Sequence, residues 1–214
     1  MNAKINIGCG PLPTEGWGNY DNSPSIIISK SDFLTWLMSS LRLISPSNMA
    51  VIKSAKENNI KYLDATKPFP FASNSLEAIY SSHVLEHFDR NEASFFLSEC
   101  SRVLQPQGVV RILVPDFRKQ ILDYCDHGDM DLFMEKSLLT EPRPQSFSQK
   151  LKLAIVGVRN HLWMYDETSL IKLLKRVGFS DVRPIPPGQT RIKEPGELNL
   201  LERADESICI EASK

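Results

Sequence analysis

Short apolar runs alternate with amphipathic segments along most of this chain, and this alternation limits what the chain can fold into. The apolar runs predict strands over 4–7, 17–21, 60–64, 76–81, 109–114, 182–185 and 207–212. Helical spacing of apolar residues predicts helices over 33–44, 49–57, 91–104 and 167–179. Such alternation favours a doubly wound α/β fold, a mainly parallel seven-stranded sheet with helices on both faces.

Length and composition favour a single domain over residues 1–214. One hydrophobic core serves up to ~250 residues, and 42% hydrophobic with 24% charged residues is ordinary for a globular protein. Residues 117–160 interrupt the strand–helix alternation with mixed signals. We expect them to form an insertion over the carboxyl end of the sheet, on the substrate side of a cleft.

Charge and cysteine usage exclude several classes of protein. A net charge of −1 gives no strong nucleic-acid signal. The four cysteines are far apart and form neither a zinc-knuckle nor a disulfide pattern. No signal peptide is visible, and no apolar run approaches the ~18 residues that would predict a membrane span. We therefore expect a cytoplasmic protein without a membrane span.

The first two predicted strands end in residues suited to binding a ligand. In open α/β sheets, ligands bind beyond the carboxyl ends of the strands. Gly8 and Gly10 follow the first strand, where glycine permits positive φ and close approach of the backbone. Asp21 ends the second strand and can accept hydrogen bonds from ribose hydroxyls. Each feature alone is also typical of an ordinary surface turn.

The next two strands end in the same way. Asp64 and Ala65 follow the third strand, where a carboxylate can accept an adenine amino proton and an amide can face a ring nitrogen. Ser82 and His83 follow the fourth strand. Because these residues come after four successive strands, they predict one binding site rather than four unrelated turns.

Five segments resemble the class I S-adenosylmethionine-dependent methyltransferases, most closely the small type found in sugar and polysaccharide modification. They cover roughly two-thirds of the chain in the order INIGCG, GWGNYD, LDATKPFPFASNSLEAIYSSHVLEHF, SECSRVLQPQGVVRILVPD and HLWMYDETSLIKLLKRVGF. The resemblance implies a Rossmann-like methyltransferase fold, S-adenosylmethionine as cofactor, and a small-molecule or sugar-type methyl acceptor.

The resemblance also implies roles for the strand-end residues. It places Gly8 and Gly10 at the methionine part of the cofactor and Asp21 at the ribose. It places Asp64 and Ala65 at the adenine, and Ser82 and His83 where the site closes.

Two features depart from the family pattern. Asn6 stands where the family's first motif usually has an acidic residue, so it cannot neutralise the amino group of the cofactor. Only 11 positions separate Gly10 from Asp21 (21 − 10), whereas a parallel crossover with its helix needs at least ~10–12 residues. We therefore expect the first crossover helix to be short or absent.

The sequence leaves two alternative functions open. His83-Val84-Leu85-Glu86-His87 fits the H-x-x-E-H pattern of a zinc hydrolase, in which His83 and His87 would share one face of a helix. The other alternative is a non-catalytic methyltransferase-like binding domain. The methyltransferase interpretation is preferred, and with it no metal is expected.

Two histidines are candidates for catalysis. We expect His161 to act as a base on the acceptor side and His83 to lie on the cofactor side near the methyl group. The neighbouring Trp163 is expected in the core, while Tyr165 is expected either in the core or in a substrate wall. Arg111 interrupts an apolar strand, which predicts an ion pair at a sheet end.

Overall fold

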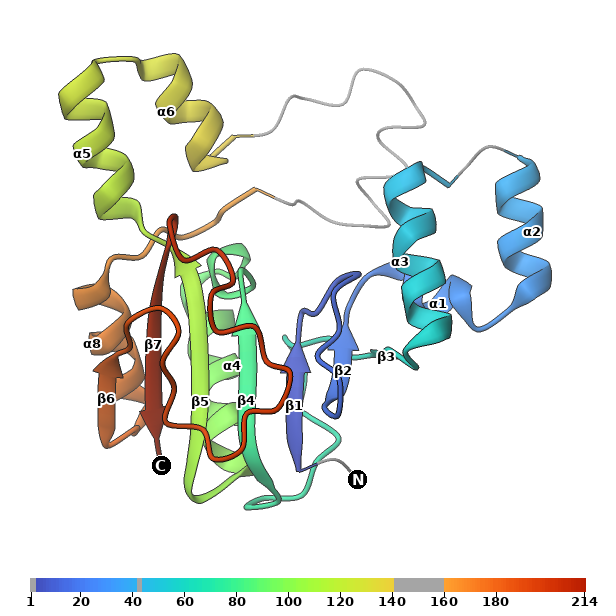
Figure 1. Cartoon of the computed structure of the whole chain (residues 1–214), viewed down its shortest axis with the longest axis horizontal. Coiled ribbons are helices and arrows are strands. Elements are labelled where there is room, and N and C mark those ends of the chain that lie inside the picture. Colours follow the sequence, from blue (N-terminus) through green and yellow to red (C-terminus); the bar gives the residue numbers. More distant parts are fainter. Residues whose placement is uncertain (1–2, 42–43, 141–159) are drawn as a thin grey trace.

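A seven-stranded sheet forms the centre of the computed structural model, which describes residues 3–41, 44–140 and 160–214. The strands lie in the order β3-β2-β1-β4-β5-β7-β6, and only β7 pairs antiparallel to β5 and β6 (Figure 1). Their bounds are β1 Lys4–Ile7, β2 Gly18–Asp21, β3 Lys61–Tyr62, β4 Leu76–Ser82, β5 Leu104–Pro115, β6 Asp181–Pro184 and β7 Ser207–Ser213. The predicted fold class, a Rossmann-like methyltransferase sheet, is confirmed.

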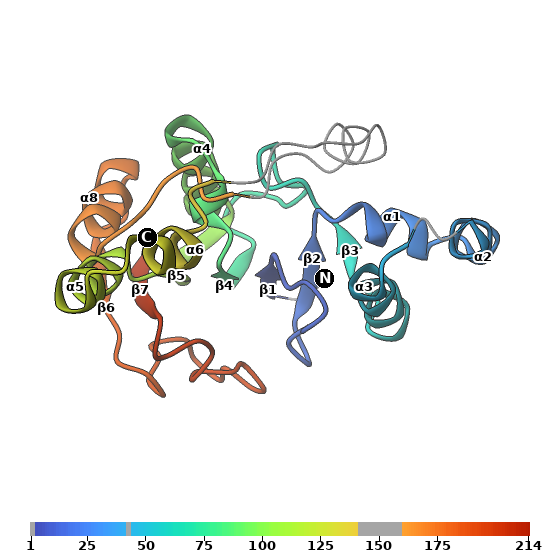
Figure 2. The same cartoon turned by 90° about the horizontal axis from the view of Figure 1, so that it is seen from above.

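The two faces of the sheet have different covers. Helices α4 (Arg90–Val103) and α8 (Glu167–Val177) pack on one face through the largest apolar core, which includes Phe96, Leu97 and Leu173. Loop 185–206 runs across the other face and buries Ile192 and Leu198 there, as the view from above shows (Figure 2). A loop thus covers much of a face for which the sequence predicted helices.

A buried ion pair joins this loop to the sheet. Arg111 in β5 lies opposite Glu211 in β7, with 2.7 Å between Nη1 and Oε1, and both side chains are buried. Arg111 also donates to the Gln189 carbonyl, while Glu211 accepts from Thr190 and from the Arg191 amide. The predicted ion pair exists, but it lies in the middle of the sheet rather than at its end.

The first crossover holds no helix, as expected. The chain from Gly8 to Trp17 is a sequence of turns fixed by two buried asparagines. Asn6 donates to Thr14 Oγ1 at 3.0 Å, and Asn19 both donates to the Thr14 carbonyl and accepts from its amide. These side-chain bonds take the place of a helix in holding the turns against the sheet.

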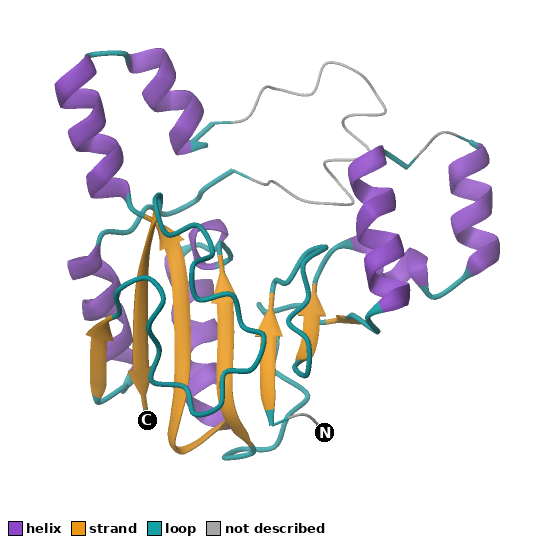
Figure 3. Ribbon diagram, in the orientation of Figure 1, coloured by secondary structure: helices purple, strands orange, loops and turns teal. Residues whose placement is uncertain are grey.

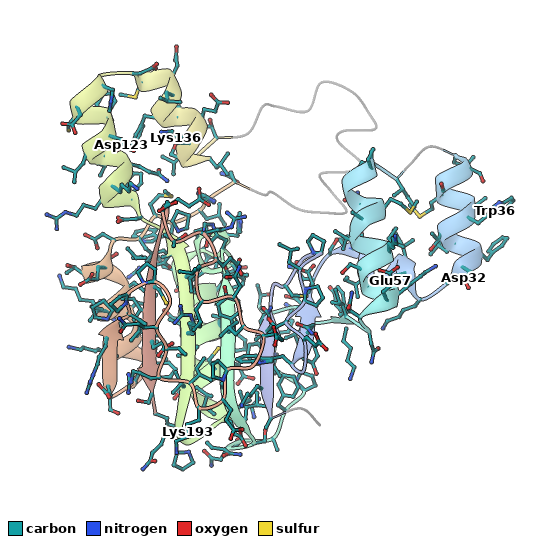
Figure 4. All side chains as sticks on the ribbon, viewed as in Figure 1. Asp32, Trp36, Glu57, Asp123, Lys136 and Lys193 are labelled. Atoms are coloured by element: carbon teal, nitrogen blue, oxygen red, sulfur yellow. The ribbon has the colours of Figure 1, made fainter. Side chains whose placement is uncertain are left out.

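Helices α1 (Pro24–Ser29), α2 (Asp32–Ser40) and α3 (Pro46–Glu57) form a group at the β3 edge of the sheet (Figure 3). Ser31 caps α2 by accepting a hydrogen bond from the Leu34 amide. No residue of α2 is fully buried, so its predicted apolar face finds no core, and Trp36 points outward (Figure 4).

Helices α5 (Phe117–His127) and α6 (Met130–Ser137) stand beyond the carboxyl end of the sheet, where the 117–160 insertion was expected (Figure 1). Phe133 of α6 packs on Phe117 and Tyr124 of α5. Asp123 Oδ2 lies 4.0 Å from Lys136 Nζ, which pairs the two helices a second time (Figure 4). Residues 141–159 of that predicted segment lie outside the described residues. No helix in the described ranges is long and apolar enough to span a membrane.

Candidate functional site

A cleft of about 820 Å³ opens at the carboxyl ends of the first four strands. This volume lies within the range of small-molecule and cofactor pockets. Six of the predicted site residues line it together: Gly8, Gly10, Asp21, Asp64, Ala65 and His83. Parallel strands bring the turns after β1, β2, β3 and β4 to one edge of the sheet, which explains why residues far apart in sequence meet here.

Glycine stands at positions 8 and 10 for different structural reasons. Gly8 has φ +79°, and a Cβ at this position would lie 2.1 Å from Val84 Cγ2, so no other residue fits without a rearrangement. Gly10 has φ +53° and nothing within 4 Å of a built Cβ, so its turn is open. Because neither residue has a side chain, a ligand in the cleft can approach the backbone of this turn closely.

Asp21 is oriented by two backbone amides. Its Oδ2 accepts from Gly10 N at 2.9 Å and its Oδ1 accepts from Ser23 N at 2.7 Å. A carboxylate has about four acceptor positions, so each oxygen retains capacity for a hydroxyl donor. The side chain is thus held in place before any ligand binds.

The wall beyond Asp21 comes from β3 and the edge helices. Asp64 Oδ1 accepts from both the amide and the hydroxyl of Thr66, which fixes the carboxylate at the rim. Tyr62, Ile27 of α1 and Val51 of α3 add largely apolar surface. Helix α1 was not predicted, because its six residues are too few for a helical period to be recognised.

Ser82 does not line the cleft. Its hydroxyl donates to Glu202 Oε1 at 2.8 Å, and Tyr80 donates to the other oxygen of the same carboxylate. Ser82 therefore anchors the end of loop 185–206, and its side chain is not among those that line the cleft where a cofactor contact was expected.

His83 lines the cleft, but both its ring nitrogens are engaged. Nε2 lies 2.7 Å from Ser207 Oγ, and Arg203 Nη1 lies 3.1 Å from Nδ1. Since a guanidinium can only donate, Nδ1 is the acceptor and Nε2 carries the proton. Burial, aided by the Arg203 charge, lowers the pKa of His83 to about 3. His83 is therefore a neutral positioning residue rather than a proton acceptor.

The HVLEH segment is not a helix with His83 and His87 on one face. His83 has φ +53°, and only Leu85–His87 is helical, as a single 3-10 turn. Both histidines line the cleft, but His83 Nε2 is bonded to Ser207 Oγ. The ligand pair required by the zinc-hydrolase alternative does not form.

His161 is not among the residues that line the cleft. It is 6% exposed, and its ring packs edge-on against that of His87, with 5.1 Å between centroids. Burial, with the nearby His87, lowers its pKa, so the ring is neutral near pH 7. His161 was expected on the acceptor side as a base, but His87 lies between it and the cleft.

Of the two aromatic residues near His161, one lies in an expected place and the other does not. Tyr165 is buried in the core, whereas Trp163 is 41% exposed and lies under the Arg90 guanidinium at 4.6 Å. The prediction that Trp163 is a core residue is wrong. Its cation–π contact with Arg90 satisfies the ring at the surface instead.

Sequence reasoning missed Glu86, the residue most out of place in this region. Its side chain is 1% exposed, and neither carboxylate oxygen has a hydrogen-bond partner among the described residues. Burial raises its pKa to about 8. Glu86 is part of the HVLEH segment, but if that segment were a helix, only His83 and His87 would share a face as metal ligands.

Comparisons with known proteins give a family match over part of the chain. A family model described as a methyltransferase domain matches residues 43–112, about a third of the chain. A search of curated proteins finds no match. The family match supports the expected methyltransferase activity.

Solved structures with similar folds have low sequence identity. A SAM-dependent methyltransferase from Archaeoglobus fulgidus is 15% identical, with 99% of this chain and 85% of that chain covered and a TM-score of 0.48. One from Thermotoga maritima is 14% identical, with 99% and 81% covered and a TM-score of 0.47. A chain from the complex of the Haloferax volcanii Trm112 methyltransferase activator with a methyltransferase is 11% identical, with 98% and 80% covered and a TM-score of 0.48.

Proposed function

We propose that this chain transfers a methyl group from S-adenosylmethionine to a small-molecule or sugar-type acceptor. The observation that carries the proposal is the Gly10–Asp21 hydrogen bond within a cleft that also contains Asp64 and Ala65. This arrangement presents a carboxylate for ribose hydroxyls beside a low glycine turn, and a second carboxylate farther along the wall for the adenine amino group.

When bound, S-adenosylmethionine would supply an electrophilic methyl group on its sulfonium. An acceptor would attack this methyl carbon directly, with S-adenosylhomocysteine as the leaving group. The protein's part is then to hold both reactants in line and to exclude water. Gly8 and Gly10 would lie along the methionine part and Asp21 at the ribose. Asp64, with the amide of Ala65, would bind the adenine.

The acceptor would enter beside His83 and His87, beneath helices α5 and α6. These two histidines line the end of the cleft that follows β4, and α5 and α6 lie beyond the carboxyl end of the sheet. Since His83 is neutral and bonded through both nitrogens, its role would be to shape this end of the site. A hydroxyl acceptor would need another group to take its proton.

A transfer assay tests the proposed activity. The full chain would be incubated with methyl-labelled S-adenosylmethionine and separate pools of sugars, phenols, amines and carboxylic acids. We expect label in a product from one pool and a stoichiometric yield of S-adenosylhomocysteine. Tight cofactor binding without transfer to any pool would instead favour the non-catalytic alternative.

A further inference from the structure

A largely buried cluster lies at the acceptor end of the cleft. It consists of Glu86, His87 and His161, which offer one ligand atom each within 4.8 Å of one another. Only His87 also lines the cleft. The cluster is therefore a separate feature that the cofactor site leaves unexplained.

The Glu86 carboxyl is the central anomaly of this cluster. It is 1% exposed, and within the described part of the chain neither oxygen has a hydrogen-bond partner. Burying a polar group without a partner is costly, and buried polar groups without one are rare in folded proteins. Its Oε1 lies 3.8 Å from His161 Nε2 and 3.3 Å from His83 Nδ1, on which Arg203 also converges. A bound cation would satisfy this carboxylate.

The backbone holds the three residues together across a long sequence separation. The Glu86 carbonyl accepts from the amides of Leu162 and Trp163 at 2.8 and 3.1 Å. The His161 amide donates to the Leu138 carbonyl at 2.9 Å. The segment that carries His161 is thus fixed against the 3-10 turn that carries Glu86 and His87.

The orientation of His87 matches that of a metal ligand. Its Nδ1 lies 3.2 Å from the Asn160 carbonyl oxygen, which can only accept, so the proton is on Nδ1 and the lone pair is on Nε2. Metal-binding histidines almost always donate their other ring N–H to a carbonyl or carboxylate in this way.

We propose that Glu86, His87 and His161 bind a divalent transition-metal ion of the Zn²⁺ type. Two imidazoles and one carboxylate suit Zn²⁺, and three protein ligands leave a fourth coordination position open. Metal–ligand distances of ~2.0–2.2 Å place tetrahedral ligand atoms about 3.3–3.6 Å apart. Glu86 Oε1 and His161 Nε2 are 3.8 Å apart, and all three ligand atoms lie within 4.8 Å of one another, so side-chain rotations that bring them closer together would complete the site.

The position of this site gives the metal a role, which rests on the proposed methyl transfer. Because His87 borders the cleft, a metal ion bound by this cluster would lie next to the expected acceptor end. An acceptor hydroxyl bound there would release its proton to solvent more readily. Its oxygen would then form the new C–O bond as the C–S bond breaks, with the electron pair going to sulfur. This selects a hydroxyl-bearing acceptor.

Metal titration of the full chain tests the proposal. Protein stripped with a chelator and dialysed would be titrated with ZnCl₂ by calorimetry, and Co²⁺ would report tetrahedral ligation by its visible absorption. We expect one Zn²⁺ per chain, and at least ~100-fold weaker binding in Glu86→Gln and in His161→Ala. The matched control is His127→Ala, which removes an exposed histidine of α5 and should leave binding unchanged.

Thermal unfolding shows whether a variant that does not bind Zn²⁺ is nevertheless folded. Zn²⁺ should raise the Tm of the wild-type chain and of His127→Ala, but not that of Glu86→Gln. No stoichiometric Zn²⁺ binding by the wild-type chain would overturn the proposal. Loss of binding in His83→Ala with retention in His161→Ala would also overturn it, in favour of the HVLEH pair.

A parallel titration with S-adenosylhomocysteine separates this proposal from the proposed function. Cofactor binding without Zn²⁺ binding overturns the metal site alone. Zn²⁺ binding without cofactor binding supports the metal site and overturns the methyl-transfer role assigned to it.

Discussion

The backbone N–H of Gly10 donates a 2.9 Å hydrogen bond to Asp21 Oδ2, which ties the turn after β1 to the end of β2. The other oxygen of Asp21 is held by the Ser23 amide. In a fold whose first crossover holds no helix, this carboxylate both fixes the glycine turn and faces the cleft.

Asp21→Ala should weaken S-adenosylhomocysteine binding by roughly 1–3 kcal/mol, because the ribose hydroxyls lose their acceptor while remaining accessible to water. Asp21→Asn should also weaken binding, since its amide nitrogen cannot accept from the Gly10 or Ser23 amide. Calorimetry measures both affinities. Unchanged affinity in a folded Asp21→Ala variant would remove Asp21 from the site.

Gly8→Ala should destabilise the fold by about 1–3 kcal/mol, because its Cβ would meet Val84 Cγ2 at 2.1 Å and φ is +79°. Adding Val84→Ala removes the clash but not the backbone strain, so the double variant should cost less than the sum of the two single changes. Urea unfolding measures each free energy. Strict additivity would show that the two side chains do not conflict.

Arg111→Met should destabilise the protein by about 3–5 kcal/mol, since it leaves the buried Glu211 carboxylate without its cation. The matched control is Arg183→Ala, which removes an exposed pair with Asp181 and should cost no more than ~1 kcal/mol. Chemical denaturation compares them. Equal costs for the two variants would contradict the buried pair's role in fixing loop 185–206.

Thiol reactivity should distinguish one cysteine from the other three. Cys125 is exposed, whereas burial raises the pKa of Cys9 to about 12, helped by Asp21, and that of Cys209 to about 12. Burial also raises the pKa of Cys100. Thiolate is the reactive form, so an aromatic disulfide reagent at pH 8 should modify one thiol quickly and three slowly. More than one fast thiol would contradict the burial of this core.

The sheet and the first half of the site were predictable because their signals are local. Each signal is read from neighbouring residues: an apolar run of strand length, the glycines directly after β1, and the carboxylate at the end of β2. The parallel topology then places those strand ends at one edge. The chain positions of Gly8, Gly10 and Asp21 therefore sufficed to bring them together.

The acceptor end was not predictable, because distant backbone contacts decide it. Nothing near His161 in sequence shows that the next two amides bind the Glu86 carbonyl, or that His161 is buried behind His87. Likewise, Ser82 looks like a cofactor contact until Glu202, 120 residues later, accepts its hydrogen bond. The spacing of His83 and His87 suggested a helix, but His83 takes a positive φ.

Titration of the chelator-treated full chain with S-adenosylhomocysteine, with heat as the readout, tests the central claim most directly. The account predicts saturable binding of one molecule per chain, weakened in Asp21→Ala but not in the exposed control Arg183→Ala. Absence of saturable binding by the folded wild-type chain would contradict the assignment of this cleft as a cofactor site.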